Sequence, residues 1–393
     1  MMAVGDVHVS RPDPGSAFVN VASVLEQGDI NMGNLEGPIC DQGQFIPGKF
    51  EIGSAHLISS PMNIKGLVAG RFKAMGLANN HQMDYGGEGL LQTIEILDQA
   101  GIAHAGAGHN LEEAHKIALL EQKGTRVAFL SYTSLYLPVG YAAEVDKPGV
   151  ATLKIHTAYE ALENVLYQPG IPPIIITIPD PIELNIMLDN IRRAKEIADI
   201  VVLCPHWGVG LGYGRVVAYQ KAVGRAAIDA GADLVMGSHP HRLLGMEIYK
   251  GKLICYSLGH CILDGVKMPQ FGVDTAFVKC YVHDKHIQKY SLIPARINKD
   301  TLQPELLDTE QGMTVAKSLD TMSQEFGTTF TPEGEEFVIG GPKAGTPEPL
   351  PPPAVYADSI VSVSYLKNGK PFERRQSLAA EAREKFRVAS GGY

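Results

Sequence analysis

The sequence predicts an α/β fold with sheets in the middle and helices outside. Short, unbroken apolar runs alternate with segments whose apolar residues recur at helical spacing. Strands that are apolar along their whole length are typical of sheets covered on both faces. Polar residues gather where several of these runs end, which is where α/β folds build their sites. With 393 residues, the chain is long enough for one large domain or two ordinary ones.

Apolar runs and turn residues predict the individual elements in chain order. We expect strands over residues 2–4, 30–36, 72–77, 126–133, 200–206, 232–236, 252–260 and 276–283. Apolar residues at helical spacing predict helices over residues 89–101, 184–199 and 218–232.

The composition changes near residue 297. A proline-rich stretch at 347–353 is typical of a stiff linker, Asn368-Gly369 favours a hairpin, and a charged helix is expected near the C-terminus. We therefore expect a catalytic body over residues 1–296 and an accessory C-terminal arm over 297–393.

Charge and cysteine usage exclude several classes of protein. A net charge of −9 without a long basic run argues against a nucleic-acid partner, whereas an anionic substrate stays compatible because bound divalent metals reverse the local field. The five cysteines form no CxxC pair, which favours a reducing compartment. No secretory leader and no membrane span are recognisable, so we expect a cytoplasmic protein. A lost leader or anchor, and association between copies, are alternatives that stay open.

The stretch "GSHPH" (237–241) places two histidines two residues apart behind an apolar run. If the strand continues through them, His239 and His241 point to the same side. We expect Gly237 to permit a tight turn and Pro240 to stiffen the display of both imidazoles. The alternative is a polar loop without a ligand.

Metal-type ligands follow several predicted strands: Asp6, His8, Asn34, Glu36, Asn79, Asn80, His81, His206, His239 and His241. A mixture of carboxylates, amides and imidazoles suits a pair of divalent ions better than one structural zinc. Ions of this kind lower the pKa of a bound water, which can then attack a phosphorus or carbonyl centre.

These segments resemble a known family. "GDVH" (5–8), "GNLEGP" (33–38), the "ANNHQMDYGG" block and its helix (78–108), "HWG" (206–208) and "DLVMGSHPH" with its continuation (233–259) are similar to the CapA family. That family is associated with poly-γ-glutamate capsule synthesis and degradation, and is a branch of the calcineurin-like metallophosphoesterase superfamily. The resemblance covers roughly residues 3–265 and implies a four-layer α-β-β-α sandwich with a C-terminal extension.

The resemblance also implies residue roles around two divalent ions (Mn, Zn or Fe). The implied ligands are Asp6, His8 and His241 on the first ion, Glu36 between the ions, and Asn80, His206 and His239 on the second. His81 would be the acid that protonates a leaving group or steadies the transition state.

Three further residues are candidate substrate contacts, each with an alternative. His260 stands where relatives carry Asn in Ser-Leu-Gly-Asn-Phe, and could instead be a ligand or support one. Asp84 is favoured as a cap of the following helix over a substrate contact. Trp207 either forms a pocket wall or packs in the core. The run after it, "VGLGYGR", lacks the acid that relatives usually carry.

The resemblance and the ligand set together favour a dinuclear hydrolase that cleaves an amide bond, γ-glutamyl or peptide-like, in a small or polymeric anionic substrate. A phosphoesterase with the same ions is the first alternative. A non-catalytic assembly factor for an anionic polymer, with a vestigial metal site, is the second.

Overall fold

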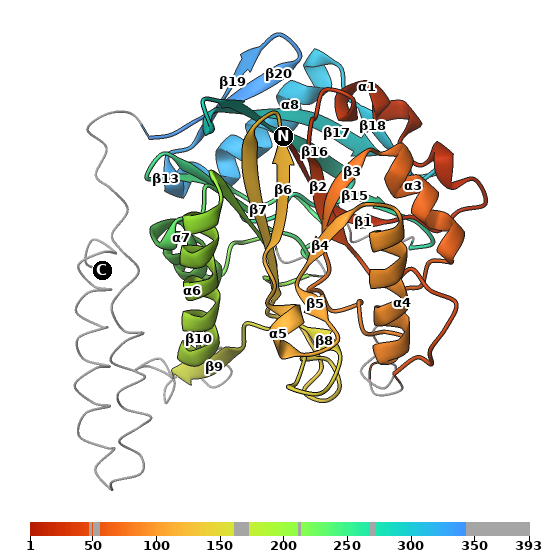
Figure 1. The fold of residues 1–393 in the computed structure, drawn as a ribbon. Coiled ribbons are helices and arrows are strands. Elements are labelled where there is room, and N and C mark those ends of the chain that lie inside the picture. Colours follow the sequence, from red (N-terminus) through yellow and green to blue (C-terminus); the bar gives the residue numbers. More distant parts are fainter. Residues whose placement is uncertain (47–48, 50–55, 161–172, 211–213, 267–271, 343–393) are drawn as a thin grey trace, which may run out of the picture.

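A computed structural model describes residues 1–46, 49, 56–160, 173–210, 214–266 and 272–342 (Figure 1). It is a mixed α/β structure with two large sheets, as the alternation of strands and helices predicted. The linker, hairpin and terminal helix expected after residue 346 lie outside the described residues.

The larger sheet has ten strands and contains the N-terminus. Along its main path it runs β19 (Thr329–Glu333), β20 (Glu336–Gly340), β17 (His286–Ile297), β16 (Asp274–His283), β1 (Met2–His8), β2 (Asn31–Leu35), β3 (Phe72–Gly76) and β4 (Ala103–Ala105). Two further strands pair off this path, β15 (His260–Leu263) with β1 and β18 (Pro304–Leu306) with β17. The strands β1 to β4 are parallel, so their carboxyl ends share one edge.

The smaller sheet has six strands. Its order is β13 (Met246–Tyr249), β14 (Lys252–Cys255), β12 (Leu234–Met236), β11 (Ile200–His206), β7 (Thr125–Thr133) and β6 (Ala118–Gln122). The central strands β14, β12, β11 and β7 are parallel to one another.

Alternate residues of β11 show why its sequence is apolar throughout. Ile200 and Val202 belong to a core cluster shared with the ten-stranded sheet, whereas Val201 and Leu203 belong to a cluster shared with helices. Because successive side chains of a strand face opposite ways, burial of both faces requires apolar residues at every position.

Helices cover the outer faces of both sheets (Figure 1). Helices α3 (Ile64–Ala69) and α4 (Gly86–Gln99) share a cluster with β1 to β3. Helices α6 (Pro181–Ile197) and α7 (Ala218–Ala230) share one with β7 and β11. The start of α6 precedes the predicted residue 184 because the Asp180 side chain accepts hydrogen bonds from the backbone N–H groups of Ile182 and Glu183.

Two predicted strand boundaries were wrong for reasons of close packing. Strand β1 continues through Gly5 to His8, and a Cβ on Gly5 would lie 1.9 Å from the carbonyl oxygen of Gly259. The expected single strand 252–260 is two strands in different sheets. The chain crosses from β14 to β15 with Gly259 at φ +71°, a conformation that glycine adopts without strain.

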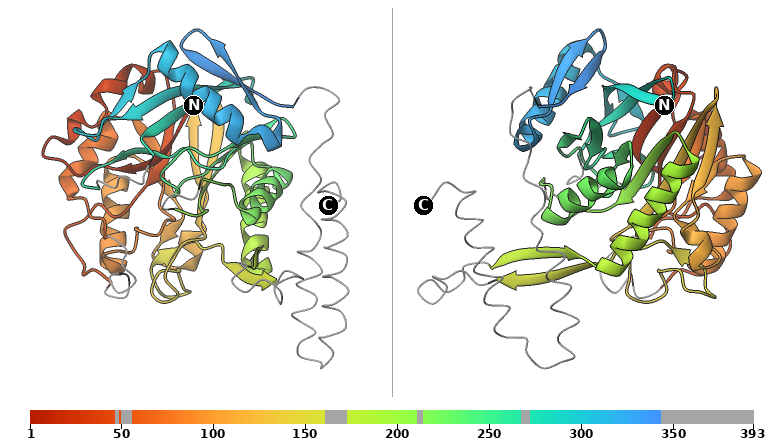
Figure 2. Two further views of the ribbon diagram at one scale, coloured as in Figure 1. Left: turned by 180° about the vertical axis from the view of Figure 1, so that it is seen from behind. Right: turned by 60° about the vertical axis from the view of Figure 1, so that its left-hand side comes forward.

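The remaining elements extend this framework. Strands β18 and β20 pair with β17, and helix α8 (Thr309–Met322) packs into the cluster between the sheets, so residues up to 340 are continuous with the ten-stranded sheet. The expected boundary after residue 296 falls within β17. A separate ribbon of β9 (Ile155–Glu160) and β10 (Ile174–Pro179) extends away from the sheets (Figure 2). The shorter elements are α1 (Ala22–Leu25), α5 (Leu111–Ala114) and a two-stranded pair of β5 (Ala107–Gly108) with β8 (Gly149–Val150).

All five cysteines are buried and unpaired. Among the helices that the structure describes, none combines the length and apolar character that a membrane crossing requires.

Candidate metal centre

Strand ends from both sheets meet at one place. In the ten-stranded sheet, Asp6 on β1 lies opposite Asn34 on β2 and His260 on β15. In the six-stranded sheet, His206 ends β11 and lies opposite Ser238, which follows β12. The predicted gathering of ligand-type side chains therefore depends on the contact between the two sheets.

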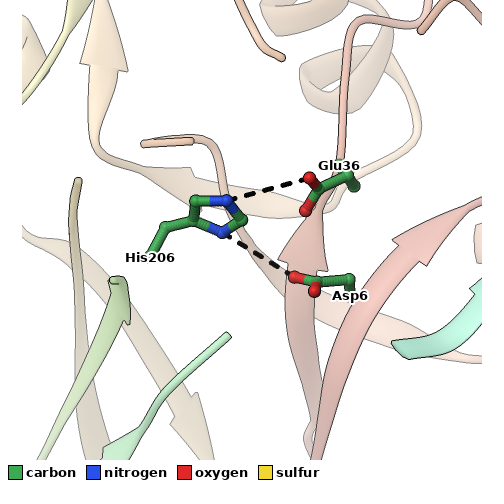
Figure 3. Close-up of side chains that lie close together, drawn as sticks. All are labelled: Asp6, Glu36 and His206. Atoms are coloured by element: carbon green, nitrogen blue, oxygen red, sulfur yellow. Dashed lines mark ion pairs between the residues drawn. The ribbon is translucent and has the colours of Figure 1, made fainter. Parts of the chain in front are cut away.

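Asp6, Glu36 and His206 form the tightest group (Figure 3). One ligand atom from each lies within 4.8 Å of the others, and all three residues are fully buried. The His206 ring lies between the carboxylates, with Nδ1 3.7 Å from Oδ1 of Asp6 and Nε2 3.7 Å from Oε1 of Glu36. Two acids and an imidazole at this spacing suit a divalent cation.

Asn34 holds the two carboxylates together. Its Nδ2 donates to Oδ1 of Asp6 at 2.8 Å and to Oε2 of Glu36 at 2.9 Å. Asn79 in turn donates to Oδ1 of Asn34 at 3.2 Å and to the Leu35 carbonyl at 2.7 Å. Asn79 also shapes the local chain, since its Oδ1 accepts from the backbone N–H of His81 at 3.0 Å.

Burial and proximity separate the pKa values of the two acids. Burial and the neighbouring Asp6 raise the pKa of Glu36 well above its ordinary value. Burial by itself would raise the pKa of Asp6, but the interactions of its carboxylate with His241 and His206 outweigh it and lower that pKa. A bound cation would stabilise both acids in their ionised forms.

Oε1 of Glu36 is the centre of the site. It accepts no hydrogen bond from any described residue. Three imidazole nitrogens surround it, Nε2 of His206 at 3.7 Å, of His81 at 3.8 Å and of His241 at 4.0 Å. A buried carboxylate oxygen without a donor is costly unless a ligand compensates it, and imidazoles with a carboxylate form a suitable donor set for Mn, Zn or Fe.

The histidines of the His-Pro-His motif lie in a turn and not on a strand, because β12 ends at Met236. His239 has φ +97° and His241 has φ +53°, a region that non-glycine residues rarely adopt. Strain of this kind collects at functional sites. Gly237 does not supply the turn; a Cβ there would lie 2.4 Å from Nε1 of Trp207.

Asp6 holds this turn to the site. The backbone N–H of His239 donates to Oδ2 of Asp6 at 3.1 Å, and Nδ1 of His241 lies 3.3 Å from the same oxygen. The His239 ring is 5.0 Å from that of His206, and its buried Nδ1 has no hydrogen-bond partner among the described residues. Burial lowers the pKa of His239, so the ring is neutral, as a metal ligand must be.

The other predicted ligands lie around this group. His206 is within hydrogen-bond distance of Asn80 Oδ1 through Nε2, at 2.7 Å, and of Ser238 Oγ through Nδ1, at 2.9 Å. Burial lowers the pKa of His206 to about 3. Buried His8 reaches the backbone carbonyl of Glu36 through Nδ1 at 2.9 Å, a contact that fixes its ring orientation.

His81 is held from behind by Asp84, and the expectation that Asp84 caps the following helix was wrong. Tyr85 occupies the N-cap position of α4, and no side chain caps that helix. Oδ2 of Asp84 lies 2.7 Å from Nδ1 of His81. Asp84 is fully buried, and this contact orients the His81 ring. Burial lowers the pKa of His81 to about 4.

His260 and Trp207, the remaining candidate substrate contacts, lie in different surroundings. The buried His260 ring is 6.1 Å from that of His241, and burial lowers its pKa to about 4. Trp207 is 1% exposed, stacks on Tyr256 and donates to the Tyr256 carbonyl at 2.9 Å. These contacts favour packing in the core over a pocket wall.

Sequence reasoning missed Lys49, Tyr141 and Ser238. Nζ of Lys49 lies 2.8 Å from Nδ1 of His81, Tyr141 donates to Asp84 at 3.0 Å, and Ser238 contacts His206. Ser238 directly precedes the His-Pro-His motif, so its proximity in the sequence was a usable signal. Lys49 and Tyr141 lie in segments whose composition predicted no site.

Comparison with known proteins agrees with the resemblance of the motifs. The family described as "Bacterial capsule synthesis protein PGA_cap" matches residues 1–265. A protein of Sinorhizobium fredii is 33% identical over 311 residues, 68% of this chain and 67% of the relative. The PGA biosynthesis protein CapA of Bacillus subtilis is 29% identical over 326 residues, with 80% and 76% covered. A probable polyglutamine synthesis accessory protein of Mycobacterium tuberculosis is 28% identical over 309 residues, with 76% and 73% covered. The chain therefore belongs to the PGA_cap family of bacterial capsule synthesis proteins, the CapA family, within the metallophosphoesterase superfamily.

Proposed function

We propose that the chain is a dinuclear metal-dependent hydrolase that cleaves an amide bond, of the γ-glutamyl or peptide-like kind, in an anionic substrate. The observation that carries the proposal is Oε1 of Glu36, which is buried, accepts no hydrogen bond from the described residues and lies within 4.0 Å of three imidazole nitrogens. A cation is the ligand that this arrangement lacks.

The proposed ligands fall into two groups that share Glu36. Asp6, His8 and His241 would hold one divalent ion, and Asn80, His206 and His239 the other. The short contacts of Asp6 with His241 and of Asn80 with His206 support this division. Ions held there would polarise the scissile carbonyl and lower the pKa of a bound water.

We extend the proposal to the fold, as the four-layer α-β-β-α sandwich of the metallophosphoesterases. Three buried clusters support it, one between the sheets and one under the helices on each outer side.

His81 is the proposed acid. Its Nε2 faces Oε1 of Glu36 at 3.8 Å, while Asp84 and Lys49 hold Nδ1 from the opposite side. A ring held in this way can deliver a proton to the departing nitrogen. His260, next to His241, is the proposed substrate contact.

The substrate class comes from the relatives. Their names refer to PGA biosynthesis, capsule biosynthesis and polyglutamine synthesis, which supports an anionic glutamyl polymer or a fragment of one. The net charge of −9 makes bound cations the expected attraction for such a substrate.

The test uses the manganese-loaded full chain with γ-glutamyl anilides and with an aryl phosphate. Release of aniline is expected, and phosphate release without amide cleavage would instead assign a phosphoesterase to the same centre. His81→Ala should keep its metal and lose about 10²–10⁴-fold in turnover. His109→Ala, at an exposed histidine paired with Glu113, is the matched control and should retain full activity.

A non-catalytic role in polymer assembly is the second candidate, favoured by the words "accessory" and "biosynthesis" in the relatives' names. Metal analysis separates the two candidates, because a folded chain that retains no ion after dialysis would support assembly and contradict the hydrolase.

A further inference from the structure

Lys49 is a buried lysine placed behind the proposed acid. Its side chain is 4% exposed, although it comes from the segment between β2 and α3, far from His81 in the sequence. Its Nζ lies 2.5 Å from the Asn80 carbonyl oxygen, 2.5 Å from Oδ1 of Asp84 and 2.8 Å from Nδ1 of His81. These three atoms match the three N–H groups of an ammonium ion.

Nδ1 of His81 therefore contacts two groups, Asp84 and Lys49, that favour opposite protonation states of this nitrogen. Asp84 Oδ2, at 2.7 Å, is an acceptor and requires a proton on Nδ1. Lys49 Nζ, at 2.8 Å, is a donor and requires a bare Nδ1. A neutral imidazole carries one proton, so the contact that prevails decides whether Nε2 is protonated.

The count of hydrogen bonds favours the contact with Lys49. Without His81, Asp84 still accepts from the Leu57 backbone N–H at 2.8 Å, from Tyr141 at 3.0 Å and from Lys49. Without His81, one N–H of Lys49 faces no other acceptor among the described residues. A buried donor that lacks its partner is disfavoured, whereas Asp84 loses only one of several donors.

We propose that Lys49 is a positioning residue that sets the tautomer of His81: its ammonium donates to Nδ1, so the imidazole carries its proton on Nε2, the nitrogen that faces Glu36. Neutral His81 is thereby a proton donor toward the site without first being charged. The consequence for catalysis rests on the proposed function, but the tautomer does not.

The tautomer can be measured without any substrate. We would label the full, zinc-loaded chain with ¹⁵N-histidine and record two-bond ¹H–¹⁵N spectra, with His81→Gln identifying the signals of His81. The wild-type chain should show His81 protonated at Nε2. Lys49→Met should move the proton to Nδ1, where only Asp84 remains as partner.

Two variants separate this effect from general damage. Tyr141→Phe removes a donor from the same Asp84 carboxylate without touching Nδ1, so it should leave the tautomer unchanged. Asp84→Asn in the Lys49→Met background supplies an amide N–H that can donate to Nδ1, so it should return the proton to Nε2. If Lys49→Met does not fold, the tautomer of the wild-type chain and that of Lys49→Arg still test the inference. Arginine keeps a donor for Nδ1, so His81 should be protonated at Nε2 in both.

The kinetic counterpart uses substrates whose leaving groups differ in basicity. Lys49→Met should lower kcat most for basic leaving groups, within the roughly 10²–10⁴-fold range of general acid catalysis, and leave KM nearly unchanged. The inference is wrong if His81 is protonated at Nδ1 in the wild-type chain. It is also wrong if Lys49→Met leaves the tautomer of His81 unchanged. Absence of all hydrolysis with the expected tautomers contradicts the proposed function alone.

Discussion

Two glutamates of this protein are equally buried and differ in their surroundings. Glu36 follows β2 at the edge where the sheets meet, and Glu247 lies on β13; both are 0% exposed. Glu247 receives Nε of Arg225 at 3.0 Å, another guanidinium nitrogen at 2.9 Å and the Tyr256 hydroxyl at 2.6 Å. Glu36 receives one donor, from Asn34, and its Oε1 receives none from the described residues.

The difference separates a structural charge from a ligand site. A buried carboxylate is tolerated when a cation and hydrogen bonds compensate it. Arg225 on α7 supplies that compensation to Glu247 within the protein. At Glu36 the neighbouring imidazoles, such as those of His81 and His206, are kept neutral by burial, which favours the proposed cation site.

The largest expected effect on stability is that of Glu247→Gln. Glutamine leaves the guanidinium of Arg225 buried without a counter-charge, so the free energy of unfolding should fall by about 3–5 kcal/mol. Urea denaturation measures this, and metal content should be unchanged. Lys123→Met, which breaks an exposed pair with Asp29, should cost less than about 1 kcal/mol. A similarly small loss for Glu247→Gln would show that Glu247 is not a compensated structural charge.

Glu36→Gln should show the opposite pattern. In the metal-free chain the free energy of unfolding should change by no more than about 1 kcal/mol, because glutamine keeps an acceptor for Asn34 and removes an uncompensated charge. Metal affinity should fall by more than the ~100-fold that follows loss of a residue that only orients a ligand. Calorimetric titration with Mn²⁺ measures this; unchanged affinity would remove Glu36 from the centre.

Tyr256→Phe tests how much the Tyr256 hydroxyl contributes to stabilising the buried Glu247 carboxylate. It removes the only hydroxyl donor to Oε2 of Glu247 among the described contacts and leaves Arg225 in place. The free energy of unfolding should fall by about 1–3 kcal/mol, less than for Glu247→Gln. A loss as large as that of Glu247→Gln would show that the hydroxyl, and not the ion pair, compensates the carboxylate.

The last expected effect is on the pH dependence of stability in the metal-free chain. The folded pKa of His206 is about 3, against an ordinary 6.5, because burial disfavours the charged ring. The unfolded chain therefore binds more protons below pH 6.5, and stability falls as the pH falls toward 3. Glu36 acts in the opposite sense, since its raised pKa makes stability fall as pH rises above its ordinary value.

His206→Gln should reduce the slope of stability against pH between 6.5 and 4 by at most about 1.4 kcal/mol per pH unit. Urea unfolding at several pH values measures that slope. Lys123→Met, at an exposed residue far from the site, is the control and should leave the slope unchanged. An unaltered slope in His206→Gln would mean that the ring is charged in the folded chain.

Much of the framework was predictable from local patterns. Strands β7 and β11 and helix α6 followed from apolar runs and spacing. Asp6, Glu36 and His206 were readable as candidates because they follow predicted strands, although those strands belong to two different sheets. These features were readable because the faces of a strand or helix repeat over a few residues.

The sequence by itself determined the elements and the ligand types at their ends. Only the tertiary structure decided which buried groups are compensated. It places Asp84 and Lys49 beside the His81 ring, and it gives Glu247 a guanidinium partner, whereas Oε1 of Glu36 accepts from none of the described residues. Compensation of a buried charge depends on contacts between distant segments, as between Asp6 and the backbone of His239, 233 residues apart. The spacing of residues along the chain does not predict such contacts.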